Sequence, residues 1–450
     1  MQYLETVAAG AKLQRACSYA PEKAMFCLEG RQIHKDVREQ IPITEEMLSK
    51  HILLLGGIGS GKTNTMNCLT RNLRERMTDD DVMVIFDTKG DYYEEFYQPG
   101  DVVIANDSRA CGPDGPDYWN IFSEVSIDER IEENVLEISR TLFYDKIERS
   151  SQPFFPNAAK DLFSALMLEL IRNEERRSLR NNASLRALFD SFSVPAMKRI
   201  LERHPDLKAM CSYIDDPGSG QTLGVVAELQ QLVREIFIGR FARRGSLSVR
   251  ELIRNKGGQV IFVEYDLSIG ATLSPIYRLL IDLAIKQALC RRESEPGSVY
   301  FLLDEFRLLP NLQHVDNGVN FGRSLGAKFI IGVQNVDQIA AAYGENLAFS
   351  LLSGFSTTIA FRVGDKNSRD YIRGLYGENL KLQSYSSAVQ AKGLPEQIRE
   401  ASVVEDVDIT SLKPGQAIVG ILSCEPFLFQ FDPYKRPEKK TPKALPREIR

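Results

Sequence analysis

The stretch Gly56-Gly57-Ile58-Gly59-Ser60-Gly61-Lys62-Thr63 decides the fold class of this chain. It fits the pattern G-x-x-x-x-G-K-[S/T] of a phosphate-binding loop, in which glycines let backbone N–H groups point at phosphate oxygens. A helix that begins at Gly61 would add the positive end of its dipole. Lys62 would then contact the β- and γ-phosphates of a nucleotide, and the Thr63 hydroxyl would bind a Mg²⁺ ion that bridges them.

The surroundings of this loop favour the phosphate site over its alternative, a plain glycine turn. The apolar run 51–55 before it predicts a buried strand, and Met66, Leu69, Leu73 and Met77 after it fall on one face of a helix. A strand, a glycine-rich loop and a helix in this order are typical of nucleotide-binding α/β proteins. We therefore predict an α/β fold that binds ATP and Mg²⁺.

The apolar run 82–86 predicts a buried strand whose carboxyl end carries a candidate ligand-binding turn. Asp87 follows the strand directly, and Lys89 comes two residues later. Open α/β sheets bind ligands at the carboxyl ends of their strands, which would place this acid and this amine beside the phosphate loop. A solvated turn explains the two residues equally well.

The apolar runs 298–303 and 328–333 predict two further strands that end in residues suited to hydrolysis. Asp304 and Glu305 follow the first run. Asp304 would reach the magnesium shell, and Glu305 would accept the proton of a water that attacks the γ-phosphate. Gln334 follows the second run, where its amide would orient that water or sense the γ-phosphate. Acidic residues often end strands, so the pair indicates a hydrolase only in combination with the phosphate loop.

Length and composition describe a globular protein whose basic groups must act locally. The 450 residues predict two domains, or one domain with a large insertion. Hydrophobic residues make up 43% and charged residues 26%, which are ordinary proportions for a globular chain. Because the net charge is -5, any contact with nucleic acid must come from a local group of basic residues.

Cysteine usage and hydropathy predict a cytoplasmic protein. The seven cysteines are scattered without a C-x-x-C pair, which favours a reducing compartment and argues against a zinc site. The sequence has no apolar run long enough to span a bilayer, and its beginning lacks the apolar core of a signal peptide. We expect a chain that does not cross a membrane by itself.

Residues 123–256 have helical spacing and few strand signals, which predicts an all-helical insertion. Prolines are expected to divide this segment into separate helices. The chain would then comprise a discontinuous nucleotide-binding domain (1–122 and 257–432), the insertion, and a basic tail, 433–450, expected to be disordered. The apolar stripes are 131, 135, 138 and 142; 162, 166, 167 and 170; and 223, 226, 229, 233 and 236, and the prolines are 153, 156, 195, 205 and 217.

Arginines outside the strands allow two interpretations. They gather between 172 and 186 and between 240 and 254, where a solvated face is the usual explanation and nucleic-acid contact the alternative. Arg323 precedes the strand 328–333 and is either surface decoration or a charge donor to a neighbouring subunit. From the residue alone, decoration is favoured because exposed arginines are common.

Several segments in order resemble the coupling ATPases of type IV secretion and conjugation, which belong to the HerA/FtsK class of hexameric DNA pumps. The resemblance covers about residues 40 to 380. It rests on residues 41–44 and 51–63, Phe86-Asp87-Thr88-Lys89-Gly90-Asp91, Leu303-Asp304-Glu305-Phe306, Gly322-Arg323-Ser324-Leu325-Gly326 and Gly332-Val333-Gln334.

This resemblance implies a RecA-like sheet, an all-helical domain on the cytoplasmic side, and six subunits around a pore with ATP between subunits. By the same resemblance Arg323 is the arginine finger, Gln334 is the γ-phosphate sensor, and Asp87 and Lys89 are the acidic and basic pair beside the nucleotide. The preference for decoration at Arg323 is thereby reversed. The function implied is an ATP-driven motor that moves DNA, or a DNA–protein conjugate, through a hexameric ring.

One departure from the family keeps other functions open. Coupling proteins usually begin with a pair of transmembrane helices, which this sequence does not contain. A separate membrane-channel subunit or a relaxase-type protein would then be its partner, or the chain is a soluble relative that processes DNA or defends against foreign DNA. A nucleotide-gated adaptor that recruits protein substrates to a secretion channel is a further alternative. A small-molecule kinase fits poorly, because it gives Glu305, Arg323 and Gln334 no common purpose.

Overall fold

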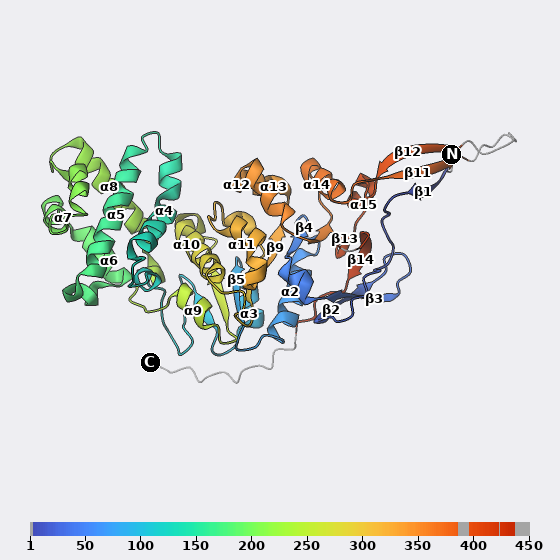
Figure 1. Ribbon diagram of the computed structural model, residues 1–450, viewed down its shortest axis with the longest axis horizontal. Helices are drawn as coiled ribbons and strands as arrows, with labels where there is room; N and C mark the ends of the chain where they lie inside the picture. The colour runs from blue at the N-terminus through green and yellow to red at the C-terminus, as the bar shows by residue number, and fades with distance from the viewer. Residues whose placement is uncertain (1–2, 386–395, 423, 437–450) are drawn as a thin grey trace, which may run out of the picture.

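A computed structural model describes residues 3–385, 396–422 and 424–436 of the chain (Figure 1). Its main element is an 11-stranded sheet in the order β3-β2-β14-β13-β10-β4-β9-β8-β5-β7-β6. The strands from β10 to β6 in this order are parallel, and the other neighbours pair antiparallel. The parallel strands are β4 (Ile52–Leu55), β5 (Val82–Asp87), β6 (Val102–Ile104), β7 (Val260–Glu264), β8 (Val299–Leu303), β9 (Ala327–Val333) and β10 (Thr357–Phe361). The antiparallel strands are β2 (Phe26–Arg31), β3 (Arg38–Ile43), β13 (Gln416–Ile421) and β14 (Phe427–Phe431).

Every residue of the parallel strands is buried, which explains why most of their residues are apolar. Buried polar residues, such as Lys328 in β9 and Thr357 in β10, are exceptions. Alternate side chains point to opposite faces of the sheet. Leu53 and Leu55 therefore belong to one hydrophobic core, and Ile52 and Leu54 belong to another. The α/β fold class and the strands expected after the phosphate loop are confirmed.

Helices cover both faces of the sheet, as Figure 1 shows for α12 and α13 on one side and α3 on the other. The core that contains Leu53 includes residues of α10 (Gly270–Leu289), α11 (Val315–Phe321), α12 (Val336–Tyr343), α13 (Glu345–Ser353), α14 (Lys366–Tyr376) and α15 (Asp406–Thr410). The core that contains Ile52 includes residues of α1 (Glu45–Ser49), α2 (Lys62–Arg74) and α3 (Asp91–Phe96).

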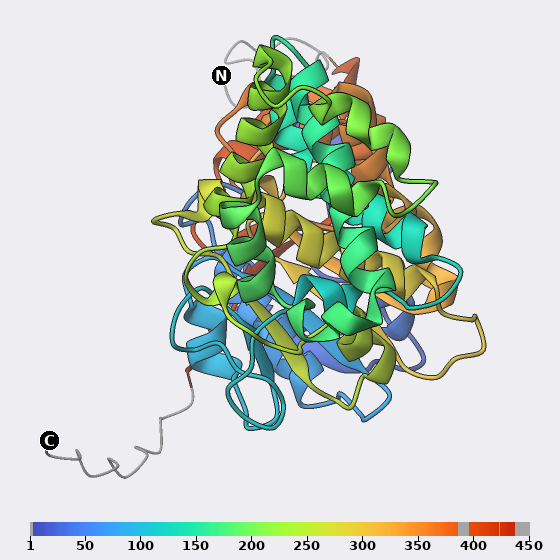
Figure 2. The same cartoon turned by 90° about the vertical axis from the view of Figure 1, so that its left-hand side faces the viewer.

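A group of helices follows β6 and precedes β7 in the chain; it lies at the left of Figure 1 and faces the viewer in Figure 2. Its α-helices are α4 (Ile131–Arg149), α5 (Phe154–Arg172), α6 (Asn182–Ser191), α7 (Val194–Leu201), α8 (Gly220–Ile236) and α9 (Val249–Asn255). The 3₁₀ helices here are η1 (Ile121–Glu124), η2 (Glu174–Leu179), η3 (Lys208–Ile214) and η4 (Gly239–Ala242), and η5 (Phe306–Leu308) and η6 (Gly322–Leu325) follow later. We retain the division of the chain into domains as a proposal.

One detail of the helical expectations is wrong. Leu223 is 58% exposed, and Thr222 and Val225 take the buried positions on this part of α8. Pro156 and Pro195 lie in the first turns of α5 and α7, where the missing N–H has no partner within the helix to lose. The apolar face of a helix is set by the neighbours it packs against, so a stripe of four or five residues can be displaced by one position.

A small second sheet was not expected from the sequence. It consists of β1 (Tyr3–Ala9), β11 (Glu378–Tyr385) and β12 (Glu396–Ser402), in the order β1-β11-β12. Arg399 on β12 forms an ion pair with Glu5 on β1 across this sheet. Lys381 and Arg399 also lie 2.7 and 2.9 Å from Glu405, which precedes α15. Charged side chains replace the apolar alternation by which strands are recognised in a sequence.

Residues 433–436, at the start of the tail that was expected to be disordered, are described by the structure. Tyr434 packs against α2 and α3, because the Arg71 guanidinium lies 4.0 Å from its ring and its hydroxyl donates to Glu95 at 2.7 Å. The rest of that prediction, residues 437–450, lies outside the described residues. Within the described ranges, no helix combines the length and the apolar composition needed to cross a bilayer.

Candidate active site

The phosphate loop joins β4 to α2, and its first two residues are hydrogen-bonded to the neighbouring chain segments. Gly56 N–H donates to Val333 O at 3.0 Å, and Gly57 N–H donates to Arg362 O at 2.9 Å, so the loop is tied to both strands beside β4. Gly61 has φ 120°. A Cβ at Gly61 would lie 3.0 Å from the backbone of Gly415, and only glycine adopts this φ without strain. The helix begins one residue later than expected, at Lys62.

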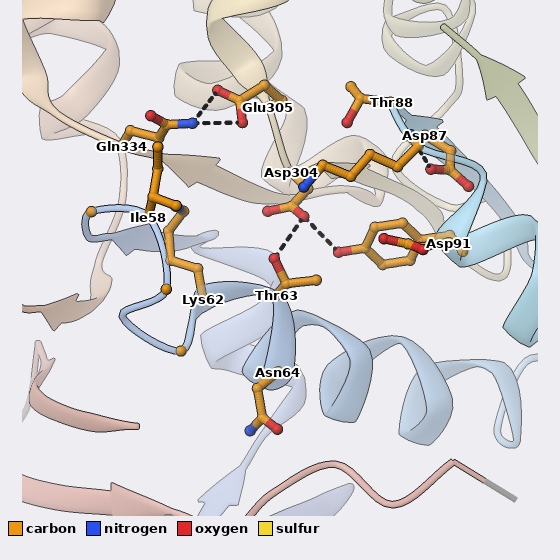
Figure 3. Close-up of a pocket in the computed structure, with 15 residues that line it drawn as sticks. Ile58, Lys62, Thr63, Asn64, Asp87, Thr88, Asp91, Asp304, Glu305 and Gln334 are labelled. Atoms are coloured by element: carbon orange, nitrogen blue, oxygen red, sulfur yellow. Dashed lines mark hydrogen bonds between the residues drawn. The ribbon is translucent and has the colours of Figure 1, made fainter. Parts of the chain in front are cut away.

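A hollow of about 270 Å³ opens above this loop at the carboxyl ends of the parallel strands (Figure 3). It brings together most of the site residues expected from the sequence. The exceptions are Gly56 and Ser60, which belong to the loop without lining the hollow, and Arg323. The lining residues are Gly57, Ile58, Gly59, Gly61, Lys62, Thr63, Asn64, Asp87, Thr88, Lys89, Asp91, Tyr92, Asp304, Glu305 and Gln334.

Lys62 is buried at the floor of the hollow and lies against its own loop. Its ammonium donates to Gly56 O at 2.8 Å. Burial lowers the pKa of Lys62, and the neighbouring carboxylates of Asp304 and Glu305 oppose that shift. One backbone carbonyl leaves two of the three ammonium donors available, so Lys62 is placed to contact phosphate oxygens.

Thr63 and Asp304 supply two oxygen atoms to the same corner of the hollow. The Thr63 hydroxyl donates to Asp304 Oδ2 at 3.4 Å, and the Tyr92 hydroxyl donates to that same oxygen at 3.0 Å. Mg²⁺ prefers oxygen ligands and is usually held by one or two protein groups together with substrate phosphates. The hydroxyl and the carboxylate therefore fit a Mg²⁺ ion that arrives with a nucleotide.

Burial raises the pKa of Asp304, and the positive charge of Lys62 opposes this shift. Tyr92 was missed from the sequence. It stands in the first turn of α3, one turn after the strand that carries Asp87, and only the fold brings its hydroxyl to Asp304.

Glu305 and Gln334 face each other across the rim of the hollow (Figure 3). The Gln334 amide donates to both Glu305 oxygens, at 3.0 and 2.9 Å. Arg307 Nε donates to Glu305 Oε1 at 2.8 Å, a contact that sequence reasoning also missed. The carboxylate is thus held in place by two side chains from neighbouring strand ends, as a general base for water requires.

Asp87 has a positioning role in this structure. It is 1% exposed, so the alternative of a solvated turn is wrong for this residue. Its Oδ1 accepts the backbone N–H groups of Lys89 and Gly90, at 3.1 and 2.9 Å, and its Oδ2 accepts that of Tyr93 at 2.9 Å. The carboxylate therefore fixes the turn that carries Lys89 to the hollow.

A second carboxyl group supports Asp87 from the neighbouring strand. Glu264 pairs with Asp87 in the register of β5 and β7, and its Oε2 lies 2.6 Å from Arg109 Nη1. Burial, followed by the charge of Asp87, raises the pKa of Glu264 to about 9. Glu264 Oε1 is buried without a donor among the described residues, so a proton on this oxygen would bond to Asp87.

Arg323 does not line the hollow of its own chain. It is exposed in η6, directly before β9, whereas Gln334 directly follows the same strand. Arg323 therefore lies at the amino end of a seven-residue strand and the hollow lies at the carboxyl end, about 20 Å away. Its side chain cannot span that distance.

A sheet of this topology with a phosphate loop after β4, an acidic pair after β8 and an amide after β9 defines a RecA-like P-loop nucleotide-binding fold. The comparison with known families agrees. Residues 37–419 match the family described as the type IV secretion-system coupling protein DNA-binding domain. The chain belongs to this family, and the resemblance inferred from the sequence is confirmed.

Individual relatives match over much of the chain at low identity. The coupling protein TraD of Escherichia coli K12 is 22% identical over 441 residues, which cover 93% of this chain and 58% of TraD. The protein VirD4 of Rhizobium rhizogenes is 25% identical over 259 residues, which cover 52% of this chain and 36% of VirD4. The chain thus spans little more than half the length of TraD.

The fold is shared with the plasmid coupling protein TrwB. Its complex with the non-hydrolysable ATP analogue ADPNP aligns with a TM-score of 0.71 at 16% identity and covers 97% of this chain and 96% of that one. At this identity the likeness establishes the fold alone.

Proposed function

We propose that this chain is an ATP-hydrolysing motor that moves DNA, or a DNA–protein conjugate, through a ring of identical subunits. The single observation that carries the proposal is the convergence of Lys62, Thr63, Asp304, Glu305 and Gln334 on one hollow at the carboxyl ends of the sheet. A binding protein needs the first three groups, but a positioned carboxylate and amide at the γ-phosphate side are the parts of a hydrolase. Family membership supports DNA as the substrate.

Each group has a separate task in the proposed reaction. Lys62 and the N–H groups of the loop bind the β- and γ-phosphates of ATP, and Thr63 and Asp304 hold Mg²⁺, which neutralises charge on those phosphates. Glu305 accepts the proton of the attacking water, and Gln334 orients that water. Both can contact the water while they keep their mutual hydrogen bonds, because Gln334 donates only through Nε2 and Glu305 Oε2 accepts only one of the bonds to described side chains. TrwB has been solved with ADP and Mg²⁺, which supports the same pair of ligands here.

The proposed site is completed by a second copy of the chain. Among the described residues no arginine lines the hollow, and Arg323 stands at the opposite edge of the sheet. Two aromatic side chains near it are unusually exposed for their size: Phe321 at 68% and Phe349 at 58%, on helices that pack together. Apolar exposure next to an exposed arginine that forms no ion pair with a described residue suits a subunit interface. We propose that Arg323 enters the hollow of a neighbour within a hexamer.

The partners and location follow from the proposed function. DNA is the transported substrate, and a membrane-channel subunit or a relaxase-type protein would connect the ring to a secretion channel at the inner face of the membrane. The chain itself would work from the cytoplasm.

The central experiment measures ATP hydrolysis without DNA, with single-stranded DNA and with duplex DNA, together with particle size in the same samples. We expect DNA to raise the rate and the active particle to be larger than a monomer. Lys62→Ala is the control, since loss of this donor should remove turnover by roughly a hundredfold or more. A rate that ignores both DNA forms in a particle of one subunit would contradict the motor.

The trans role of Arg323 is tested by mixing inactive variants. Arg323→Ala subunits and Glu305→Gln subunits should each be inactive alone, with a loss of about a thousandfold or more for the arginine. Mixed rings should recover hydrolysis at those interfaces where an intact Glu305 meets an intact Arg323. Assembly is followed by sizing, and mixtures that assemble but stay inactive would exclude the trans arrangement.

A further inference from the structure

The arginines of the helical segment differ in whether their charge is already paired. Arg243 and Arg244 are exposed, and neither forms an ion pair or a side-chain hydrogen bond with any residue that the structure describes. Most of the other arginines in the two sequence clusters face carboxylates. These pairs are Arg172 with Glu132 and Asp206, Arg176 with Glu169, Arg180 with Glu174, Arg186 with Asp190, Arg250 with Glu137, and Arg254 with Glu251.

The two unpaired arginines border a surface hollow of about 830 Å³, which we call the arginine hollow. Among the described residues, no acidic side chain lines it, so the positive charge there is not neutralised by the lining residues. Its lining residues are Tyr118, Ala183, Arg186, Gly239, Arg240, Ala242, Arg243 and Arg244.

The segment that carries these arginines is held rigidly at both ends. A Cβ at Gly239 would lie 2.2 Å from Asn106 Oδ1, and a Cβ at Gly245 would lie 1.9 Å from Tyr118 O, so only glycine permits these approaches. Between them, the buried amide of Asn182 donates to Phe241 O at 2.9 Å. Arg243 and Arg244 therefore project from a fixed backbone, and a ligand would not have to order the segment first.

An aromatic ring stands beside the arginines. Arg240 Nη1 donates to the Tyr118 hydroxyl at 3.1 Å, and its guanidinium lies 5.7 Å from the centre of that ring. Arginines next to an accessible tyrosine can contact the backbone phosphates and the base faces of a nucleic acid at the same time. An acidic peptide would use the charges but not the ring.

We propose that the arginine hollow binds DNA, with Arg243 and Arg244 contacting backbone phosphates and Tyr118 contacting a base. This inference rests on the proposed function and adds the surface through which the chain holds its substrate. Guanidinium groups bind phosphates by paired hydrogen bonds, which makes unpaired arginines on a fixed segment suited to a polyanion.

The position of the hollow agrees with a role in the motor. Arg240 N–H donates to Asn106 Oδ1 at 3.1 Å, and Asn106 closely follows β6. Because β6 is parallel to β7, its carboxyl end lies at the same edge of the sheet as the nucleotide hollow. Figure 1 places α9, which follows this segment, between the helices at the left and the sheet. DNA bound here would contact the joint between the two parts of the molecule.

The test compares DNA affinity of the wild-type chain with that of the double variant Arg243→Ala, Arg244→Ala across a series of salt concentrations. Fluorescence anisotropy of labelled single-stranded and duplex oligonucleotides gives Kd at each salt. We expect Kd near 0.1 M salt to rise about tenfold or more. The slope of log K against log salt should fall by about 1.4 for single strands or about 1.8 for duplex, as expected for two lost phosphate contacts. Arg199→Ala is the matched control, because Arg199 is exposed on α7, outside the hollow, and forms no ion pair with the described residues.

The outcomes separate this inference from the proposed function. If the wild type binds DNA and the double variant keeps both its Kd and its salt slope, the hollow is not the DNA surface while the motor stands. If the wild type binds no DNA, both the inference about the arginine hollow and the proposed DNA motor are wrong. A double variant that binds DNA normally but loses a polyglutamate peptide would assign the hollow to acidic proteins and overturn the inference. An unchanged thermal midpoint shows that the variants are folded.

Discussion

Two clusters of buried charged residues in this molecule shift the pKa of a carboxyl group in opposite directions. In the nucleotide hollow, burial raises the pKa of Asp304, and Lys62 does not offset it. At the junction of α4, α9 and α10, burial also opposes the charge on Glu137. There, however, hydrogen bonds from His314 and Lys286 hold the pKa of the carboxyl below its ordinary value.

The difference lies in how many cations each carboxylate contacts. Glu137 is 2.7 Å from His314 Nε2, 2.7 Å from Lys286 Nζ and 3.1 Å from Arg250 Nη2. Among the side chains that the structure describes, Asp304 receives two hydroxyl donors, and it lines the open volume of the hollow. Glu137 is therefore a saturated structural group. Asp304 is suited to accept one more cation, as the proposed magnesium ligand must. A buried carboxylate therefore indicates a functional site where the cations that would neutralise it are missing, and a structural role where they are present.

The largest effect is expected from Glu305→Gln, in the same hollow as Asp304. The amide keeps the size of the side chain but cannot accept the proton of water, so hydrolysis should fall by roughly 10²–10⁴-fold. ATP should still bind, because the phosphate loop is untouched. Rapid-quench measurement of bound ATP and ADP checks both expectations, and turnover at the wild-type rate would remove Glu305 as the base.

Glu137→Gln is the matching change at the junction. It leaves the cations of Lys286 and Arg250 partly buried without their carboxylate, which should destabilise the chain by about 3 kcal/mol. Urea unfolding followed by tryptophan fluorescence measures this loss, since Trp119 is buried in the core that contains α4 and α10. ATP affinity should change less than twofold. A variant with normal stability and weakened ATP binding would show that Glu137 is a functional group of the nucleotide site and not a structural one.

Local sequence predicted the groups that follow a buried strand directly. Asp304, Glu305 and Gln334 were found because a strand buried on both faces leaves an unbroken apolar run with a clear end. The same logic located the phosphate loop, whose glycines are required by backbone geometry. These features depend on neighbours in the chain, which a sequence displays.

The contacts that were missed depend on neighbours in space. Tyr92 reaches Asp304 only because β8 lies beside β5, the strand that precedes α3. Arg307 is an exception, since it is two residues from Glu305 in the chain and the turn of η5 brings its side chain back to the carboxylate. The small sheet was missed because ion pairs replace apolar alternation. No pattern in the sequence sets the order of β5 and β7, which places Glu264 opposite Asp87.

The pair of Glu264 and Asp87 tests a third kind of buried carboxyl, one that stays neutral. The pKa of Glu264 is about 9 in the folded chain, above the ordinary value of 4.5. The groups that face it are Asp87, Arg109 and Asp107. A pKa raised on folding contributes stability that is complete below pH 4.5 and is lost as pH rises toward 9. The wild type should therefore lose up to about 1.4 kcal/mol per pH unit in this window through Glu264.

Glu264→Gln keeps the shape of the side chain, can donate to Asp87 and accept from Arg109, and does not titrate. The variant should match the wild type near pH 5 and exceed its thermal midpoint increasingly toward pH 8. Glu264→Ala, which loses the packing and both hydrogen bonds, is the control and should be less stable than Glu264→Gln at every pH. Parallel pH profiles for the wild type and Glu264→Gln would mean that Glu264 is charged in the folded protein and belongs with Glu137.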